Sequence, residues 1–583
     1  MTKLLRYLLG CSILLISACA KQSSPMGGPK DEDPPVLIGS NPTNQSTEVK
    51  PEEISLDFDE YITLETPNQS IIITPRIETE KVEFLANKNR VTITLNQELE
   101  DTTTYLFNFQ TSIQDITEKN PAERLKLVFS TGPTIDSLQL SGTVDFVQPF
   151  DKPNFEDVLI GLYRETDTTD LFTAPPYYIT QADSAGGFVI TNIKAGKFKA
   201  YAWYDDNNSL KAEYRNEAYG FLTDPVDINT NVTDLHINLA KANLSELKIS
   251  RSSGTGTNYD VVLSKPIVDF QIDHPDKNES LFYRQQDNSI RLYHRNLQND
   301  STQIRLQLQD SVGNRVDTLL YANFQESQRN KEKLTVTSNA TNEFIDEINA
   351  MLTFNKPLYQ IQYDSLFFSY DSAGRIPITP EMLSFSDSTH LRTRLQLNYR
   401  VPDTLTIAKL TLNASDSTFQ DIENQWNEET IKTTFSRLKT DNLADGISGV
   451  VATNERPLLV QLLNTSDEPV LEQYLTDTNY FSFTNIEATT YKIQVIVDQN
   501  QNKRWDPGNY RLLRQPEPIY YFYDAEEQTD ELIVRGGWTL EDLIIEPRRK
   551  SGFPANTEES IRETQSIRLP LEILILEEED LMN

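Results

Sequence analysis

Phe188-Val189-Ile190-Thr191-Asn192-Ile193 recurs at a constant offset, with no gap, as Phe481-Ser482-Phe483-Thr484-Asn485-Ile486. In both copies large apolar residues alternate with other residues, which is the period of a β-strand with one buried face. The match continues downstream, where Asp205 and Asn207 align with Asp498 and Asn500. A repeat of this length predicts that the chain contains the same β-unit twice.

The same alternation predicts antiparallel sheet elsewhere in the chain. Arg90-Val91-Thr92-Ile93-Thr94-Leu95 alternates polar and apolar residues, and Tyr105-Leu106-Phe107-Asn108-Phe109 follows with a more apolar pattern. The composition agrees, because 25 Tyr and 26 Phe residues suit half-buried pleated surfaces. Helical patterns are scarce, and the one candidate covers 557–564. The sequence therefore predicts an all-β chain.

Residues 34–133 resemble the SbsA-type bacterial Ig-like domain family. The resemblance rests on Pro34-Pro35, on Asn41-Pro42, on residues 54–60 and on the closing Phe129-Ser130-Thr131-Gly132. It implies a β-sandwich of about seven strands. It implies no activity, because such folds host many functions.

The repeated unit resembles the transthyretin-like or carboxypeptidase-regulatory-like β-sandwich. Gly142-Thr143-Val144 and Gly449-Val450-Val451 carry the resemblance, together with the phenylalanine strands and the aromatic strands that end in aspartate. It implies transthyretin-like sandwiches over 137–242 and 440–548.

The Ig-like pattern also recurs, since residues 352–357 echo 56–60. This predicts a second Ig-like domain over 330–438 and leaves 244–328 as a β-sandwich of unassigned type. We expect these five tandem sandwiches to follow one another end to end. At about 3.3 Å per residue along strands, such a row reaches on the order of 100 Å.

The N-terminus has the pattern of a secretion signal. Lys3 and Arg6 precede an apolar run that is too short to span a bilayer. Ile16-Ser17-Ala18-Cys19 resembles the lipobox of bacterial lipoproteins, which implies a signal peptide over 1–18 and acylation of Cys19. The alternative is an ordinary signal peptide with a chance cysteine. Residues 19–33, rich in Ser, Pro and Gly, are expected to form a flexible tether on this lipid anchor.

The residues after Cys19 bear on localisation. Ala20 follows the cysteine where an aspartate would resemble an inner-membrane retention signal, so we expect the outer membrane. Lys30-Asp31-Glu32-Asp33 is similar to the acidic export signals of Bacteroidota surface lipoproteins, although it lies further from the cysteine. The cell surface and the periplasmic face stay as alternatives.

Composition argues against several classes of function. The formal net charge is −34 and no basic patch is visible, so a nucleic-acid partner is not expected. Loss of Cys11 with the signal peptide and acylation of Cys19 leave no disulfide. The four histidines are scattered, and no nucleophile-elbow or metalloprotease motif is found, so no enzymatic activity is predicted.

One loop is a candidate metal site. Asp498, Asn500, Asn502 and Asp506 place oxygen ligands at short intervals after a strand, as calcium loops do, and Arg504 would add its carbonyl. The EF-hand pattern is not met, because Lys503 and Asn509 stand where its glycine and glutamate would be. The alternative is an Asx-rich turn. Calcium is therefore the one cofactor that the sequence nominates.

Three further segments suggest contacts with other molecules. Tyr520-Tyr521-Phe522-Tyr523 could stack on sugars or anchor a protein interface, the alternative being an ordinary strand with one core face. The charged tail, 549–583, contains the apolar run 568–576, which either adds a strand to a partner sheet or closes the last domain. Repeated Asp-Ser and Asp-Thr motifs, such as Asp136-Ser137-Leu138, resemble the O-glycosylation sites of exported Bacteroidota proteins.

These features favour a non-enzymatic outer-membrane lipoprotein that acts as a scaffold or accessory subunit of a membrane protein complex. Its expected partners are the membrane, through the lipid, and an outer-membrane protein. The alternative is a surface lipoprotein that binds glycans.

Overall fold

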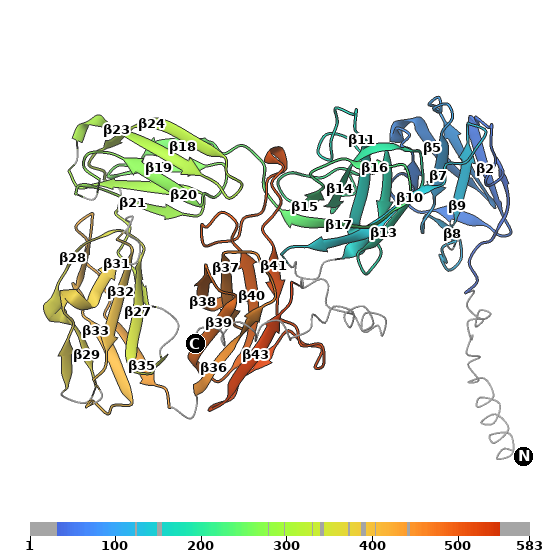
Figure 1. The fold of residues 1–583 in the computed structure, drawn as a ribbon. Coiled ribbons are helices and arrows are strands. Elements are labelled where there is room, and N and C mark those ends of the chain that lie inside the picture. Colours follow the sequence, from blue (N-terminus) through green and yellow to red (C-terminus); the bar gives the residue numbers. More distant parts are fainter. Residues whose placement is uncertain are drawn as a thin grey trace, which may run out of the picture.

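The computed structural model describes residues 32–547, except 123–124, 149–153, 278, 297, 329, 339–342, 371–373, 386–391, 403 and 440–442. The described chain is almost entirely β-structure, arranged as five sandwiches (Figure 1), so the predicted all-β fold class is confirmed. Cys19, the signal peptide, the candidate helix 557–564 and the apolar run 568–576 lie outside the described residues. No helix in the described part is long and apolar enough to cross a bilayer.

The first sandwich covers residues 37–130. One sheet has the order β1 (Leu37–Asn41), β2 (Glu53–Phe58), β6 (Arg90–Leu95), β5 (Val82–Asn87), and the other has the order β4 (Ile72–Thr74), β7 (Thr104–Asn108), β9 (Lys126–Ser130). β3 (Ile62–Leu64) pairs with β8 (Ile113–Asp115), and the short helix α2 (Pro67–Ser70) precedes β4. The predicted alternation is seen in β6, where Val91 and Ile93 are fully buried.

The fourth sandwich, residues 336–437, has the same strand order as the first. β25 (Val336–Ser338), β27 (Glu347–Phe354), β32 (Arg394–Arg400) and β31 (Leu383–Phe385) follow one another like β1-β2-β6-β5. β29 (Leu366–Ser369), β33 (Lys409–Ala414) and β35 (Ile431–Arg437) follow one another like β4-β7-β9, with β30 (Arg375–Pro377) and β26 (Glu343–Phe344) added at the edges. β28 (Leu358–Ile361) pairs with β34 (Phe419–Asp421) as β3 pairs with β8.

The second and fifth sandwiches, residues 138–241 and 443–545, also share their topology. β10 (Leu138–Phe146) pairs antiparallel with β13 (Gly187–Ile193) and parallel with β17 (Val232–Lys241). β36 (Leu443–Val451) pairs in the same way with β39 (Tyr480–Glu487) and β43 (Thr539–Ile545). A Cβ at Gly142 would overlap the carbonyl oxygen of Leu235, and one at Gly449 would overlap that of Leu543. Both glycines are therefore required by the close approach of the last strand.

The opposite sheets of these two sandwiches agree as well. In the second the order is β12 (Tyr178–Gln181), β11 (Val158–Arg164), β14 (Gly196–Tyr204), β15 (Ala218–Phe221), with β16 (Val226–Ile228) on β14. In the fifth it is β38 (Pro469–Leu475), β37 (Leu458–Leu463), β40 (Thr490–Val497), β41 (Ile519–Tyr521), with β42 (Leu532–Ile533) on β40. In the second sandwich β15 also pairs with β17, which joins the two sheets.

The third sandwich, residues 249–324, has seven strands. β18 (Ile249–Gly254), β19 (Asn258–Leu263), β22 (Ser289–His294) and β21 (Leu281–Gln286) form one sheet, and β20 (Asp269–Asp273), β23 (Gln298–Gln309) and β24 (Arg315–Phe324) form the other. Short 3₁₀ turns occur elsewhere, at Thr79–Lys81, Phe155–Asp157, Tyr363–Ser365, Pro380–Met382 and Tyr510–Leu512.

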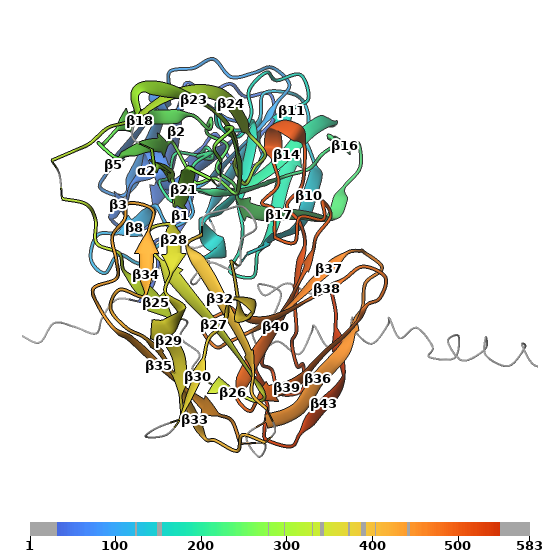
Figure 2. The same ribbon diagram turned by 90° about the vertical axis from the view of Figure 1, so that its left-hand side faces the viewer.

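The five sandwiches do not lie end to end, so the expectation of an extended row is wrong. The chain turns back after the third sandwich, and the fifth lies against the second (Figure 1; Figure 2 shows the same fold from the side). The Tyr510 hydroxyl lies 3.2 Å from that of Tyr201, and the Asn509 side chain donates to the carbonyl of Val312 at 2.8 Å. A loop of the fifth sandwich thus contacts both the second and the third.

Candidate functional site

The candidate calcium residues lie at the start of a long loop, residues 498–517, which we call the junction loop. Asp498 is fully buried at the end of β40. Its two carboxylate oxygens accept the backbone N–H groups of Asn502 at 3.0 Å and Lys503 at 2.8 Å, and the Tyr474 hydroxyl donates to it at 2.8 Å. The carboxylate therefore fixes the local turn, as an Asx-rich turn requires.

The second sandwich contains the same turn. Asp205 accepts the N–H groups of Ser209 at 2.9 Å and Leu210 at 3.0 Å, at positions that match Asn502 and Lys503 in the repeat. Asp205 is also buried, at 6 % exposure. The aspartate that ends the aromatic strand thus has the same structural role in both copies.

The structure brings the four candidate calcium residues together in one loop, but these residues form hydrogen bonds with one another. The side-chain amides of Asn500 and Asn502 both donate to the same oxygen of Asp506, at 2.5 Å. The Arg504 guanidinium points away and donates to the Val268 carbonyl at 3.3 Å. Within the described residues, no group of three or more His, Cys, Asp or Glu side chains is arranged to hold a metal ion. Calcium binding stays a prediction.

Glu517 belongs to the same loop and was not singled out from the sequence. Its side chain is 4 % exposed, and its carboxylate accepts the N–H groups of Asp506 at 3.0 Å and Asn500 at 3.4 Å. Burial raises its pKa to about 7, and the nearby carboxylates of Asp506 and Asp498 add to the effect. The loop therefore holds three buried carboxyl groups.

Glu217 occupies the matching place in the second sandwich. It precedes β15 as Glu517 precedes β41, it is 4 % exposed, and burial raises its pKa to about 7. The sequence repeat does not reveal this match, because at its constant offset Glu217 aligns with Tyr510 and not with Glu517.

The tip of the junction loop carries Tyr510 into an aromatic cluster of the second sandwich. The Tyr510 ring centroid lies 5.4 Å from that of Phe172, 5.7 Å from that of Tyr201 and 5.4 Å from that of Phe221, each in an edge-on arrangement. Gln515 also donates to the Phe221 carbonyl at 2.8 Å. Such aromatic pairs contribute about 0.5–1.5 kcal/mol each beyond the buried area.

The same loop reaches the third sandwich through two backbone carbonyls, those of Val268 and Val312. The carbonyl of Val312 accepts from Asn509 at 2.8 Å and from Arg514 at 3.4 Å, and the Val312 side chain is fully buried. Beside it, Lys265 and Asp310 form an ion pair at 2.5 Å with both side chains buried. The junction loop therefore joins three sandwiches at one place.

The aromatic segment 520–523 is not an exposed platform. Tyr520 and Phe522 lie in the core of the fifth sandwich at 8 % and 6 % exposure. Tyr521, at 6 % exposure, lies on the other face and packs with Val147 and Ala240 of the second sandwich. The segment is therefore an ordinary strand and not a platform for sugars. Its second face is buried at the junction with the second sandwich instead of being partly exposed.

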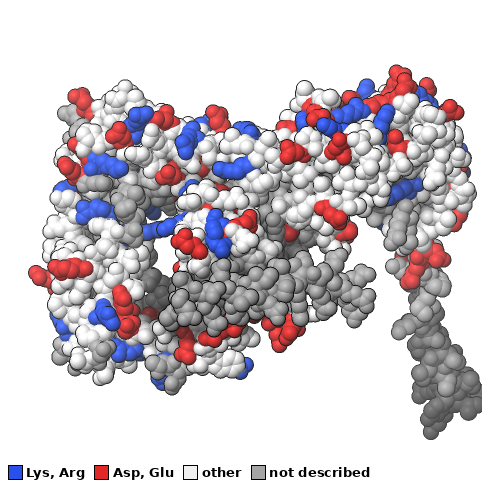
Figure 3. All heavy atoms as spheres, viewed as in Figure 1, with Lys and Arg blue, Asp and Glu red and all other residues white. Residues whose placement is uncertain are grey.

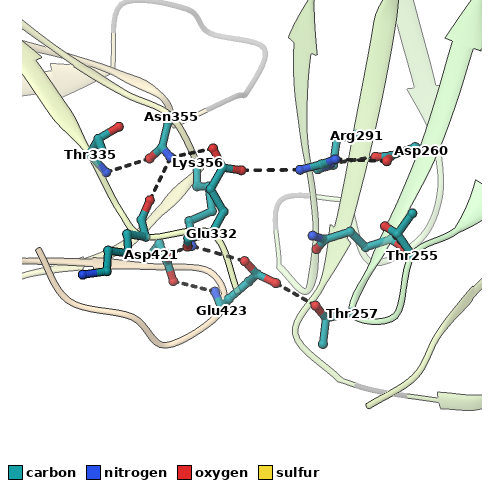
Figure 4. A network of polar contacts seen from close by, with 12 residues as sticks. Thr255, Thr257, Asp260, Arg291, Glu332, Thr335, Asn355, Lys356, Asp421 and Glu423 are labelled. Carbon is teal, nitrogen blue, oxygen red and sulfur yellow. Dashed lines mark hydrogen bonds and ion pairs between the residues drawn. The ribbon is translucent and has the colours of Figure 1, made fainter. Parts of the chain in front are cut away.

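A second buried polar group joins the third and fourth sandwiches (Figure 4). Lys356 is fully buried and forms ion pairs with Asp421 and, at 3.2 Å, with Glu423. Glu423 in turn accepts the Thr257 hydroxyl of the third sandwich at 2.7 Å. Burial raises the pKa of Asp421, and the hydrogen bond from Lys356 opposes that shift.

The outer part of this network is a partly exposed chain of ion pairs. Arg291 of the third sandwich binds Asp260 at 2.7 Å and Glu332, in the connection to the fourth, at 3.4 Å. An apolar contact supports the junction, because Ile422 packs with Phe282 and Tyr293. Lys356 could not be found from the sequence, since a lysine after a strand is usually exposed.

Comparison with known proteins identifies the first sandwich. Residues 31–131 match the family described as a bacterial Ig-like domain. The sequence resemblance is thus confirmed for this part, and the chain is a multidomain β-sandwich protein with an N-terminal bacterial Ig-like domain. No curated protein sequence matches the chain.

Several solved structures show a distant likeness. The TIE protein of Bacillus anthracis is 8% identical, with 90% of this chain and 76% of that chain covered and a TM-score of 0.12. The SGBP-B protein of a Bacteroides ovatus mixed-linkage glucan utilization locus, solved with a heptasaccharide, is 10% identical, with 60% and 85% covered and a TM-score of 0.16. The native form of Escherichia coli alpha-2-macroglobulin is 9% identical, with 85% and 42% covered and a TM-score of 0.13. These likenesses carry no argument about function.

Proposed function

We propose that this protein is a non-enzymatic outer-membrane lipoprotein, anchored through Cys19, that acts as a scaffold or accessory subunit of a membrane protein complex. The observation that carries the proposal is the packing of the junction loop against the second and third sandwiches. Tandem domains usually move relative to one another unless their interface is large and apolar. Here the fifth sandwich adds Tyr510 to an apolar cluster of the second, and through Tyr521 it shares another cluster with Val147 and Ala240 of the second.

The first sandwich, which follows the tether, is also fixed to its neighbour. Arg164 of the second sandwich binds Glu100 of the first at 2.6 Å, and the Tyr177 hydroxyl donates to the same carboxylate at 2.8 Å. Lys194 reaches the Thr102 carbonyl at 3.1 Å. A body joined in this way holds its surfaces at set distances from one another, which suits a scaffold better than a flexible capture arm.

The charge distribution suits a protein partner. On the face shown in Figure 3, Lys and Arg side chains are interspersed with Asp and Glu among larger uncharged areas. The net charge of −34 disfavours contact with anionic head groups and with nucleic acid. The lipid therefore provides the membrane contact in this proposal, and the folded body provides the contact with an outer-membrane protein.

Affinity purification from membranes in mild detergent tests the proposal. A tagged chain should recover an outer-membrane protein in stoichiometric amount, and the Cys19→Ser variant should recover far less of it. Recovery of the chain alone from several detergents would contradict a subunit role. The alternative, glycan binding, has no support from residues 520–523, because Tyr520, Tyr521 and Phe522 are buried.

A further inference from the structure

The outer face of the sheet β20-β23-β24 in the third sandwich carries an unusual set of side chains, most of which end in a planar polar group. Inward positions hold Ile272, Ile304 and Leu306, all at most 1 % exposed, so the alternate positions face solvent. The strand register aligns the outward side chains in rows across the sheet. These rows are Asp269-Gln309-Arg315, then Gln271-Gln307-Asp317, then Asp273-Arg305-Leu319, and last Gln303-Tyr321.

Every polar side chain in these rows other than the tyrosine ends in a planar amide, carboxylate or guanidinium group. Each such group places two hydrogen-bonding atoms side by side, which matches two neighbouring hydroxyls on a sugar ring. Lysine, serine and threonine, the usual residues of a solvated strand face, do not occur in the four rows. Three aspartates and two arginines nearly balance, so the face favours an uncharged ligand.

Hydrogen bonds within the face hold several of these groups in place. Arg305 binds Asp317 through two parallel bonds of 2.8 and 2.7 Å, and Gln307 donates to the same carboxylate at 3.0 Å. Arg315 donates to Gln309 at 3.0 Å. Groups that are already oriented lose less entropy when a ligand binds.

The face also has a hollow and an aromatic side chain beside it. A depression of about 350 Å³ is lined by Gln271, Gln307 and Asp317 together with their neighbours, which is within the usual size of a ligand site. In the next two rows Leu319 is 50 % and Tyr321 65 % exposed, two residues apart on the edge strand β24. An exposed ring next to planar polar groups offers a stacking surface for the apolar side of a pyranose.

We infer that this face is a binding site for a neutral oligosaccharide, with Tyr321 stacking on one ring and Gln271, Gln307 and Asp317 binding the hydroxyls of a ring further along the sugar chain. The site begins at Gln271, three residues beyond Val268, whose carbonyl Arg504 of the junction loop binds, and it is made of other residues than those that join the sandwiches. It therefore goes beyond the scaffold role, and it lies far from the aromatic segment 520–523 in the sequence.

Titration calorimetry with four neutral hexasaccharides, cellohexaose, xylohexaose, mannohexaose and maltohexaose, tests the site on the full chain carrying Cys19→Ser. At least one should bind at sub-millimolar concentration. Tyr321→Ala and Gln307→Ala should each weaken that binding about tenfold. Tyr480→Ala, which removes a tyrosine of 51 % exposure on the fifth sandwich, is the matched control and should leave the affinity unchanged.

Absence of binding to all four sugars at millimolar concentration would overturn the inference, as would binding that survives Tyr321→Ala and Gln307→Ala together. Circular dichroism of each variant checks that the fold is kept. Tyr321→Ala should not change the outer-membrane protein recovered in affinity purification, so failure of the sugar site and failure of the scaffold role are distinguishable.

Discussion

Replacing Glu217 by glutamine should stabilise the protein at neutral and alkaline pH. One carboxylate oxygen of Glu217 accepts the Glu213 N–H at 2.7 Å, and the other is buried without a hydrogen-bond partner among the described residues. Burial raises its pKa from 4.5 to about 7. A group whose pKa is higher in the folded state favours folding fully below pH 4.5, and this contribution is lost as the pH rises to 7.

The size of the effect follows from the shift. At 1.36 kcal/mol per pKa unit, ionising Glu217 in the folded state costs about 3 kcal/mol. Glutamine is uncharged at every pH and can keep the bond to Glu213, so Glu217→Gln should be more stable than the wild type by about 2–3 kcal/mol at pH 8 and equal to it at pH 4. For a cooperative unit made of the second and fifth sandwiches this corresponds to roughly 5–10 °C in Tm.

Differential scanning calorimetry of both proteins between pH 4 and pH 8 measures this difference. Glu165→Gln is the control, because it removes the same charge from an exposed position of the same sandwich and should change Tm little. A Tm difference that is the same at pH 4 and pH 8, or a Glu217→Gln protein that is less stable at pH 8, would refute the reasoning.

Three further predictions concern other parts of the chain. Lys356→Ala should destabilise the junction of the third and fourth sandwiches by about 3–5 kcal/mol, because it leaves Asp421 and Glu423 buried without their cation. The control is Lys333→Ala, which breaks an exposed ion pair with Glu428 and should change the unfolding transition little. Cys19→Ser should move the protein from the membrane fraction to the soluble fraction with an unchanged circular dichroism spectrum, and retention in the membrane would contradict lipidation there. In titration calorimetry, calcium should give a heat of binding with the wild type and none with Asp498→Ala. Equal heats with both proteins, or no heat with either, would exclude a calcium site at the junction loop.

The strands and the repeat could be predicted because their signals are local. Polar and apolar residues alternate over 90–95 because one face of that strand is buried, and the burial pattern of β6 shows this alternation directly. The glycines at 142 and 449 were visible as part of the repeated pattern, and the structure adds the reason, which is the close approach of the last strand in each copy.

The contacts between sandwiches could not be predicted in this way. Tyr510 packs with Phe172 and Tyr201, which are far away in the sequence, and an aromatic residue at an interface has the same pattern as one in a core. The calcium residues illustrate a related limit. The spacing of Asp498 and Asp506 shows that oxygen atoms gather in one loop, but not that they face the loop's own N–H and amide donors.

The fifth sandwich packs against the second and third, and this packing joins them into one body. Small-angle X-ray scattering of the soluble Cys19→Ser protein measures this most directly, with Tyr510→Ala as a variant that weakens the junction. We predict a scattering curve that fits the arrangement in Figure 1 for the wild-type junction, and a larger radius of gyration for Tyr510→Ala. A wild-type curve that requires an elongated row of independently moving sandwiches would contradict this packing.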